Sequence, residues 1–548
     1  MSTSWNTVSG DGSATYELSF GYHDEEAYAA TVEGLVADRV ASGMAGRDAT
    51  LWGRAAESEA GKRLAWVGLA QESRELVDRV SALKQELNAA GLDHVVLCGM
   101  GGSSLAPEVI CRTHGVALTV VDSSDPDYVR GALADRLTRS IVVVSSKSGS
   151  TVETDSQRRA YEAALREAGR DPRDHLVVVT DAGSPLDESA RKDGYKVFNA
   201  DPDVGGRYSA LTAFGLVPSG LAGADIGRLL DEAAAIQPHL ESDDVDNPAL
   251  RLGGLLGAAY AAGADKVVLA DHHSGLVGFG DWAEQLVAES TGKQGKGFLP
   301  VVVPGVEAPN FSPSTPDELL VTLGEASEAV PAPDSGWGAA VKAPLGAAML
   351  LWEYAVPVAG RLVGINPFDQ PDVESAKQAA RDMLEGQGTK PEPAFTDGPV
   401  TVFATDGLLG DEHTLADAVD RLLAQLGDRG YLAVMAYLDR RDDADLAGVR
   451  ESLASRTGRP TTFGWGPRFL HSTGQYHKGG APTGVFLQVT GTPAHDLAIP
   501  GRPFSLGEFI AAQAVGDAAV LAEHDRPVLR LHLDDHDQGL SAVSDVLG

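Results

Sequence analysis

One carboxylate in this sequence is placed where it could transfer a proton. Glu289 lies within Asp281–Lys296, DWAEQLVAESTGKQGK, where a helical pattern gives way to Ser-Thr-Gly. Apolar side chains recur at helical intervals before it, so Glu289 is expected near a helix end and partly shielded from water. Shielding tunes the proton affinity of a carboxylate, as a general base requires. The alternative is a solvated glutamate flanked by Lys293 and Lys296.

Hydroxyl groups cluster in a second stretch. The run Ile141–Thr154, IVVVSSKSGSTVET, is an expected strand followed by Ser146, Lys147, Ser148 and Thr151 at the start of a helix. Hydroxyls, backbone amides and an ammonium at the carboxyl edge of a sheet suit a phosphate monoester, because each oxygen can find a donor. Helix capping is the alternative, but it needs only one or two hydroxyls. The GKS or GKT of a nucleotide P-loop is missing, which argues against a nucleoside triphosphate.

A glycine-rich turn follows another expected strand. In Val95–Pro107, VVLCGMGGSSLAP, the strand runs into Gly99, Gly101 and Gly102, and Ser103 then opens a helix. Glycines let the backbone approach a ligand, and amides at a helix N-terminus suit a phosphate. The run is not GxGxxG with an acidic partner, so a dinucleotide site is the weaker interpretation. A purely structural turn is the alternative.

Three further stretches combine glycines, cations and polar residues. They are DVGGRYS with Arg207, NPFDQPDVESAK with Gln370 and Lys377, and RFLHSTGQYHK with His471 and His477. Each side chain by itself has a structural explanation: a surface ion pair for Arg207, a solvated helix position for Lys377 and a loop position for His471. Together with Glu289 and the hydroxyl cluster they indicate a shared site.

The elements that would position these residues form an α/β pattern. Short apolar runs alternate with helical segments, as in parallel sheets wrapped by helices. The expected strands begin near residues 95, 118, 141, 176, 195, 266, 400, 431, 485 and 528. We therefore expect mainly parallel, three-layer α/β/α domains with extra helices. The predicted divisions are a helical and loose N-terminal segment (1–60), a first domain (61–222) and a second domain (223–548) with a surface insertion near 304–340 and a linker near 386–399.

Composition excludes several classes of protein. The chain has 548 residues and a formal net charge of −34, which opposes binding to nucleic acids or anionic membranes because such binding rests on clustered Lys and Arg. No apolar run approaches the roughly 20 residues that cross a bilayer, and no signal segment starts the chain. Cys98 and Cys111 are too few for a disulfide framework. These features predict a cytoplasmic protein.

At this point the motifs carry a family resemblance. The sequence resembles the glucose-6-phosphate isomerase family, whose members are built from two sugar-isomerase (SIS) domains, and in particular its actinobacterial form, related to the isomerase half of transaldolase–isomerase fusions. The matching pieces span about 99 to 480 and are GMGGSSLAP, SSKSGSTVET, VGGRYS, EQLVAESTGKQGKG, NPFDQPDVESAK and LHSTGQYHKGG.

The resemblance implies a role for each matching residue. Glu289 would be the base, Arg207 would steady an enediolate, and Lys377 would assist ring opening. Phosphate and substrate contacts would come from Gly102, Ser103, Ser146, Lys147, Ser148, Thr151 and Gln370. In that family a histidine that follows the glutamate within the same domain opens the sugar ring. Here that segment has no histidine, and His471 becomes the candidate by motif similarity. A homodimer with a shared active site is also implied.

The chemistry implied by this resemblance needs no metal and no cofactor. An aldose–ketose interconversion opens a hemiacetal, moves a proton between neighbouring carbons and stabilises an enediolate, which a histidine with a lysine, a carboxylate and an arginine can perform. The pair His272-His273 and the stretch 534–537 contain metal-binding residue types but lack convincing ligand spacing.

Other functions remain open at this stage. The same base could act on either C2 epimer, which would give a dual phosphoglucose/phosphomannose isomerase. A sugar-phosphate sensor could use such domains only for binding, but it would not be expected to keep Glu289. Glucosamine-6-phosphate synthases need an N-terminal cysteine nucleophile, and this chain has no cysteine before Cys98. A transaldolase barrel is not evident.

Overall fold

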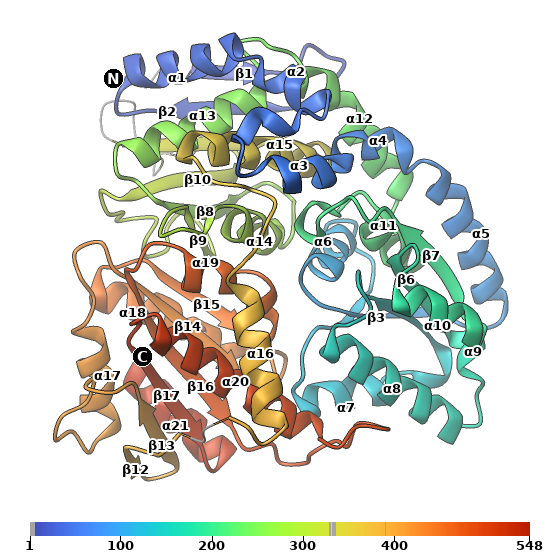
Figure 1. Cartoon of the computed structure of the whole chain (residues 1–548), viewed down its shortest axis with the longest axis vertical. Helices are drawn as coiled ribbons and strands as arrows, with labels where there is room; N and C mark the ends of the chain where they lie inside the picture. Colours follow the sequence, from blue (N-terminus) through green and yellow to red (C-terminus); the bar gives the residue numbers. More distant parts are fainter. Residues whose placement is uncertain (1–5, 328–329, 331–335, 389–390) are drawn as a thin grey trace.

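The structure, a computed structural model, contains three β-sheets, each with its own helices (Figure 1). It describes residues 6–327, 330, 336–388 and 391–548. Residues 328–329 and 331–335 of the predicted insertion and residues 389–390 of the predicted linker lie outside this part of the chain. No helix in the described ranges is long and apolar enough to cross a membrane. The prediction of α/β architecture with mainly parallel sheets is confirmed.

The first sheet has five parallel strands in the order β4-β3-β5-β6-β7. They are β3 (His94–Gly99), β4 (Thr119–Val121), β5 (Ser140–Ser145), β6 (Leu176–Asp181) and β7 (Lys196–Ala200). Successive side chains of a strand point to opposite faces. Accordingly, Val143 packs into one core, whereas Val142 and Val144 pack into another. Both faces are therefore covered, as parallel strands require.

Helices cover the two faces of this first unit. One face packs against α5 (Glu75–Ala89), α6 (Leu105–Thr113) and α11 (Ala213–Ala222). The other packs against α7 (Pro126–Ala134), α8 (Val152–Glu167) and α10 (Pro185–Asp193). A single turn, α9 (Pro172–His175), precedes β6. The buried stripe of α5 is formed by Leu76, Val80, Leu83 and Leu87, which recur at helical intervals.

The second sheet has six strands in the order β1-β2-β11-β10-β8-β9. They are β1 (Asn6–Ser9), β2 (Glu17–Gly21), β8 (Lys266–His272), β9 (Leu299–Val303), β10 (Glu318–Gly324) and β11 (Trp337–Lys342). Strands β8, β9, β10 and β11 are parallel to one another, and β2 pairs antiparallel with β11. The N-terminal segment predicted as helical and loose therefore begins with a hairpin in this sheet. Pairing with β11 buries Leu18 and Phe20 completely, and four or five residues carry too short a pattern to reveal such a strand.

The prediction of a surface insertion near 304–340 is wrong for the residues that the structure describes there. β10 lies within this range and occupies the interior of the second sheet between β8 and β11, with all seven of its residues buried. Proline, glycine and acidic residues on both sides of ELLVTLG dominate the local composition. A fully buried strand needs only a few apolar residues in succession. The composition of the whole range therefore did not indicate the short strand within it.

Helices of the second unit form its largest apolar core. They are α1 (Glu25–Ala37), α2 (Val40–Ala45), α3 (Glu57–Arg63), α4 (Leu69–Glu72), α12 (Ile226–Leu240), α13 (Pro248–Ala261), α14 (Phe279–Thr291) and α15 (Leu345–Val363). Almost every residue of α15 is buried, because it packs between α12, α13 and α14. The short 3-10 helices are η1 (Ala49–Trp52), η2 (Ala65–Gly68), η3 (Gly101–Ser103), η4 (Leu137–Arg139), η5 (Gly206–Tyr208), η6 (Ala444–Gly448) and η7 (Arg468–His471).

The third sheet corrects the prediction of two domains. Its order is β12-β13-β17-β16-β14-β15, so residues 223–548 contain strands of two different sheets. Its strands are β12 (Phe395–Asp397), β13 (Val400–Ala404), β14 (Tyr431–Tyr437), β15 (Thr461–Trp465), β16 (Gly484–Gly491) and β17 (Val528–Leu533). Its helices are α16 (Val373–Leu384), α17 (Leu415–Leu423), α18 (Val449–Thr457), α19 (Gly474–Gly479), α20 (Leu506–Glu523) and α21 (His536–Leu547). Strand patterns predict strands, but long-range pairing decides which sheet each one joins.

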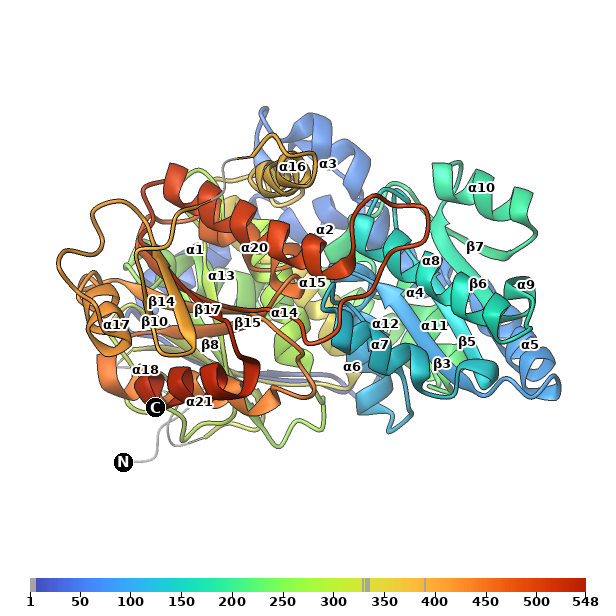
Figure 2. The same ribbon diagram turned by 90° about the horizontal axis from the view of Figure 1, so that it is seen from below.

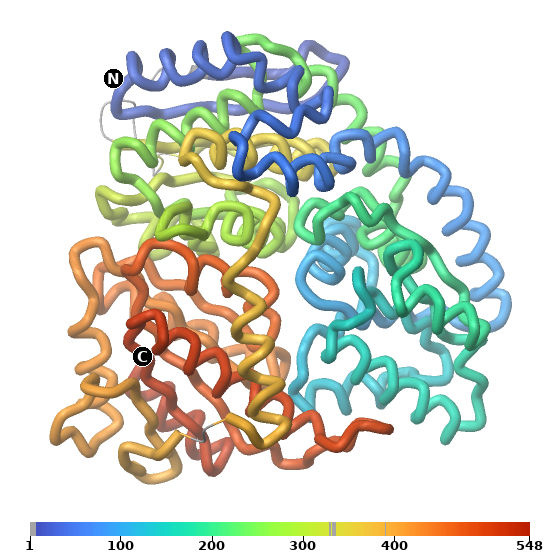
Figure 3. Tube along the Cα trace, in the orientation of Figure 1, coloured from blue at the N-terminus to red at the C-terminus, as the bar shows by residue number. Residues whose placement is uncertain are grey.

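The third sheet and its helices, which we call the third unit, also contact the first unit. The loop 492–505, red in Figures 2 and 3, extends toward α8. Arg130 donates to the carbonyl of Asp496 (3.0 Å), Arg159 to that of Pro500 (3.2 Å), and Ile499 packs into a core of the first unit. This contact holds the third unit beside the N-terminus of α8, where the hydroxyl cluster lies.

Candidate functional site

Glu289 lies in the last turn of α14, as the sequence predicts, and faces an arginine from another unit. Its Oε2 lies 3.4 Å from Nη1 of Arg207 and 3.3 Å from Nε2 of Gln285, which donates to it. The Glu289 side chain is only 12% exposed. Burial raises the pKa of Glu289, and the charges of Arg207, His471 and Lys377 partly oppose that rise. A carboxylate in this environment can accept a proton and release it again.

Arg207 is a buried cation held in one orientation. It lies in η5 and is 3% exposed. Its guanidinium donates to Oγ of Ser290 (3.0 Å), to Oε1 of Gln370 (2.8 Å) and to the carbonyls of Pro367 (2.9 Å) and Asp369 (3.0 Å). A planar guanidinium with this many acceptors has little freedom to rotate. The predicted residue Gln370 therefore orients Arg207 in this structure.

The glycine turn brings three distant segments together. A Cβ on Gly102 would lie 2.0 Å from the carbonyl oxygen of Gly206, and one on Gly101, whose φ is +54°, would lie 2.7 Å from that of His471. Only glycine allows η3 to pack this closely against η5 and η7. Ser103, the other predicted residue of this turn, is half-buried in η3.

His471 pairs with a carboxylate of the first unit. Its Nε2 lies 2.9 Å from Oε1 of Glu153, the second residue of α8, and Gln513 donates to the same oxygen (2.7 Å). Burial acts to raise the pKa of Glu153, but the charge of His471 and its hydrogen bond outweigh burial and lower it. Glu153 is thus kept ionised beside the imidazole. The carbonyl of His471 also accepts from Gln285 (2.8 Å), which links it to Glu289.

The second histidine of the same motif lies in a different environment. His477 is buried in α19, with its Nδ1 3.0 Å from the hydroxyl of Tyr431. Burial lowers the pKa of His477 to about 3, so its imidazole is neutral at physiological pH. These contacts describe a packed core histidine.

The predicted hydroxyl cluster precedes α8. Ser146 donates to Oγ1 of Thr151 (3.3 Å), and the hydroxyls of Ser148 and Ser150 lie 2.7 Å apart. Lys147 does not join them: its ammonium donates to Oδ2 of Asp181 (2.6 Å) and to the carbonyl of Pro202 (3.0 Å). The ammonium of Lys147 thus pairs with a carboxylate in this structure, and its predicted contact with phosphate stays a prediction.

A cavity of about 440 Å³ joins several of these residues. Its lining comes from the α8 N-terminus, α16, η7, α20 and the loop before α20, and includes Ser148, Thr151, Glu153, Lys377, His471 and Gln513. Lys377 is partly exposed, with its Nζ 3.7 Å from Glu374. Glu289, Arg207 and Gln370 do not line this cavity. They form a separate buried cluster, which Gln285 connects to the backbone of His471.

Several residues of the site were not singled out from the sequence. Lys293 donates to the carbonyl of Asn366 (2.7 Å) and to Oδ1 of Asp369 (2.8 Å), and burial, followed by the charge of Arg207, lowers the pKa of Lys293 to about 8. It fixes the loop that holds Arg207. Four of these residues lie within the quoted motifs, and that position could have identified them: Glu153, Gln285, Ser290 and Lys293. Gln513, in the middle of α20, carries no such signal.

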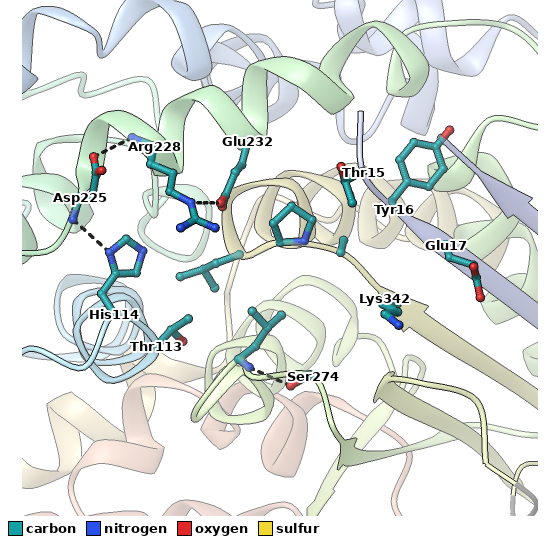
Figure 4. A pocket seen from close by; sticks show the side chains of 14 residues that line it. Thr15, Tyr16, Glu17, Thr113, His114, Asp225, Arg228, Glu232, Ser274 and Lys342 are labelled. Atoms are coloured by element: carbon teal, nitrogen blue, oxygen red, sulfur yellow. Dashed lines mark hydrogen bonds and ion pairs between the residues drawn. The ribbon is translucent and has the colours of Figure 1, made fainter. Parts of the chain in front are cut away.

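A second cavity, of about 700 Å³, lies between the N-terminal hairpin, α6, α12 and the start of α15 (Figure 4). Several of its polar groups already have partners: Arg228 donates to Glu232 (2.8 Å), and Nδ1 of His114 accepts from the backbone of Asp225 (3.0 Å). None of the predicted site residues lines it. Within the described ranges, no three His, Cys, Asp or Glu side chains are grouped so that they could hold a metal ion.

Comparison with known proteins agrees with this geometry. The model of the phosphoglucose isomerase family matches residues 65–297, which include Arg207 and Glu289. The chain is 30% identical to the probable glucose-6-phosphate isomerase of Natronomonas pharaonis over 365 residues, 58% of this chain and 85% of that protein. It is 27% identical to the one from Methanococcus maripaludis over 368 residues (57% and 84%). With the glucose-6-phosphate isomerase of Synechococcus sp. (strain JA-3-3Ab) it shares 31% identity over 355 residues, 53% of this chain and 65% of that protein.

Solved structures show the same fold. A hypothetical protein of Thermus thermophilus superposes with a TM-score of 0.58 at 24% identity and covers 67% of this chain and 99% of its own. The glucose-6-phosphate isomerase of Chlamydia trachomatis superposes with a TM-score of 0.55 at 20% identity and covers 71% and 91%. The closer resemblance to the actinobacterial form stays a prediction. By its relatives and its matching motifs, this chain belongs to the phosphoglucose isomerase family.

Proposed function

We propose that this chain interconverts glucose 6-phosphate and fructose 6-phosphate through a cis-enediolate. One observation carries the proposal: the shielded carboxylate of Glu289 lies 3.4 Å from the fixed guanidinium of Arg207, and Gln285 donates both to that carboxylate and to the backbone carbonyl of His471, whose imidazole pairs with Glu153. A base, a cation and an acid are therefore grouped in one site. Membership of the phosphoglucose isomerase family supports the same activity.

Proton transfer is assigned to Glu289. In the open aldose it removes the proton from C2, and it returns that proton to C1 to give the ketose. The raised pKa of Glu289 favours uptake of the proton, and the opposing charges of Arg207 and His471 favour its release. Arg207 stabilises the negative charge that develops on the enediolate oxygens. Its fixed hydrogen bonds mean that little reorganisation accompanies that charge.

Ring opening is assigned to His471 with Lys377. The Glu153 carboxylate holds the imidazole of His471, and an imidazole that carries a proton can donate it to the ring oxygen. The lysine lines the same cavity and offers a second cation to the opening sugar. In this pair the carboxylate orients the imidazole. The proposed steps use side chains of the chain itself.

Phosphate binding is assigned to the hydroxyls before α8. Ser146, Ser148 and Thr151, with the exposed amides of the helix N-terminus, offer donors to the phosphate oxygens. The predicted contributions of Gly102 and Ser103 remain predictions, and the close packing of Gly102 against Gly206 explains why this glycine is needed whatever its contact with substrate.

A homodimer and a cytoplasmic location remain part of this proposal. The free, buried thiols of Cys98 and Cys111 are compatible with a reducing compartment. Because His471 and Glu153 meet within one chain, the mechanism proposed above needs no residue from a second chain.

A coupled assay tests the activity. The purified chain is given fructose 6-phosphate, and glucose 6-phosphate is detected through an NADP-dependent dehydrogenase. We expect turnover by the wild type and loss of it in Glu289→Gln. Wild-type turnover that is absent, or that survives Glu289→Gln unchanged, would contradict the proposal. Mannose 6-phosphate in a parallel assay measures selectivity between the C2 epimers.

A further inference from the structure

Among the residues that the structure describes, a buried arginine of the third unit has no anionic partner. Arg530 lies in the middle of β17 and is 7% exposed. The neighbouring Leu529 and Leu531 point into the leucine-rich core on one face of the third sheet, so Arg530 points to the opposite face, toward α20. Within the described part of the chain, its guanidinium makes no hydrogen bond and no ion pair.

The contact that this guanidinium does make is aromatic. Cζ of Arg530 lies 4.1 Å from the ring centre of Phe403, its cross-strand partner on β13. Such a contact offsets a small part of the cost of removing a cation from water. Burial lowers the pKa of Arg530 to about 10, because removal from water disfavours the charged form of the guanidinium. Buried charges in proteins are normally paired, and this one is not paired with any described residue.

Two adjoining cavities meet at this side chain. One is about 640 Å³ and the other about 460 Å³, and Pro391, Phe403, Val515 and Arg530 line both of them. The smaller cavity has a mostly apolar wall formed by Met383, Leu384, Phe504, Ile510 and Ala514. We refer to the two together as the Arg530 cavity. A concave space with a mostly apolar wall on one side and a buried guanidinium has the features of a small-molecule site.

We propose that the Arg530 cavity binds a small organic monocarboxylate, whose carboxylate pairs with Arg530 and whose apolar body fills the smaller cavity. A guanidinium pairs with a planar carboxylate through two parallel hydrogen bonds. The larger cavity also carries Asp406 and Asp525, which would repel a second negative charge. Arg526 also lines the larger cavity and Glu508 lines the smaller one, so three carboxylates face two guanidiniums in the Arg530 cavity. A singly charged anion fits this balance better than a phosphate dianion.

The position of the cavity connects it to the candidate active site. Leu384, Pro503 and Phe504 line both the smaller cavity and the cavity that contains Lys377 and His471. Its walls come from α16, which carries Lys377, and from α20, which carries Gln513. A bound monocarboxylate would therefore contact the two helices that position these residues, without occupying the substrate's place.

Binding of hexanoate to the full chain tests this site directly, with isothermal titration calorimetry as the readout. We expect hexanoate to bind the wild type and to bind Arg530→Met about tenfold or more weakly, because the charge-assisted pair is lost. Hexanol, which lacks the charge, and inorganic phosphate, which lacks the apolar body, should both bind more weakly than hexanoate. Arg456→Met removes a surface charge from the same unit and should bind hexanoate like the wild type.

A second variant and a stability measurement separate binding from folding. Val515→Trp fills the junction of the two cavities while keeping Arg530, and it should also abolish hexanoate binding. Arg530→Met should unfold at a temperature no lower than the wild type, because it removes an unpaired buried charge. A structural role for Arg530 predicts a lower unfolding temperature instead.

Any of four binding results would overturn the proposal. The first is a wild type that does not bind hexanoate, and the second is hexanoate binding that survives both variants. Displacement of hexanoate by saturating fructose 6-phosphate would place the probe in the substrate cavity. Tighter Arg530-dependent binding of phosphate than of hexanoate would show that the ligand class is wrong. Because these are binding measurements, they remain informative even where the isomerase assay fails.

Discussion

Nε2 of His471 lies 2.9 Å from Oε1 of Glu153, although 318 positions separate the two residues in the chain. His471 comes from the third unit and Glu153 from the N-terminus of α8 in the first, directly after the hydroxyl cluster. The contact therefore joins the proposed acid to the proposed phosphate-binding segment. Placement of the third unit over the first is what completes the site.

Loss of the Glu153 carboxylate should weaken ring opening. Glu153→Gln keeps the shape of the side chain but removes the negative charge that faces and orients the imidazole of His471. We expect turnover of cyclic glucose 6-phosphate to fall by about 10²-fold, with a smaller effect on an acyclic substrate analogue. Steady-state kinetics with both substrates measure the difference. Equal losses on the two substrates would show that Glu153 acts in another step.

Loss of the Glu289 carboxylate should abolish proton transfer. We expect Glu289→Gln to lower turnover by about 10³-fold or more while substrate binding persists, because only the base is removed. Glu284→Gln is the matched control, because Glu284 lies on the same helix. Burial and then the charge of Asp281 raise the pKa of Glu284 to about 8. Arg207 is not among the described groups that act on this carboxyl. If the two variants lose turnover equally, Glu289 is not the base.

The two histidines of one motif should behave differently. His471→Ala should slow cyclic glucose 6-phosphate much more than an acyclic analogue, because only the cyclic form needs a proton on the ring oxygen. His477→Ala should lower the unfolding temperature through loss of its contact with Tyr431, and it should affect both substrates alike. Kinetics and thermal unfolding of the same preparations distinguish the two. A His471→Ala enzyme with unchanged activity would move the acid to another residue.

The hydroxyl cluster should affect binding more than turnover. Thr151→Ala should raise KM for fructose 6-phosphate more than it lowers kcat, because phosphate changes little during proton transfer. Lys147→Ala provides the comparison, since its ammonium is bound to Asp181, and it should change KM less. A larger KM effect for Lys147→Ala would restore this lysine to the phosphate-binding group.

Stability should depend on pH through Glu284. The pKa of this carboxyl rises from its ordinary value of 4.5 to about 8, so the folded state holds its proton to a higher pH than the unfolded state. Between these values the unfolded chain binds fewer protons, and the free energy of unfolding falls as pH rises. Glu284→Gln removes this pH-dependent loss of the free energy of unfolding, because glutamine does not titrate. Its Tm should exceed that of the wild type by a margin that grows from pH 4.5 to about 8.

Scanning calorimetry across that range measures the margin, and Glu33→Gln, which changes an exposed carboxylate on α1, is the control. A constant difference between Glu284→Gln and the wild type at all pH values would mean that Glu284 does not titrate differently in the folded and unfolded states.

The sequence by itself determined the local chemistry of this protein. The positions of β3 and β5, the end of α14 at Glu289 and the motifs that carry the family resemblance are all short-range features, because strand and helix periods and turn residues are encoded within a few positions. The geometry around Glu289 follows from the same local pattern, since Gln285 lies one helical turn before it on the same face.

Only the tertiary structure decided how these pieces combine. The chain forms three sheets instead of two, β2 pairs with β11, which begins only at Trp337, and Lys147 pairs with Asp181. Sheet pairing and ion pairs between distant segments depend on the packing of whole units, which no local period records. The partnership of His471 with Glu153 is of this kind, because it exists only when the third unit packs against α8.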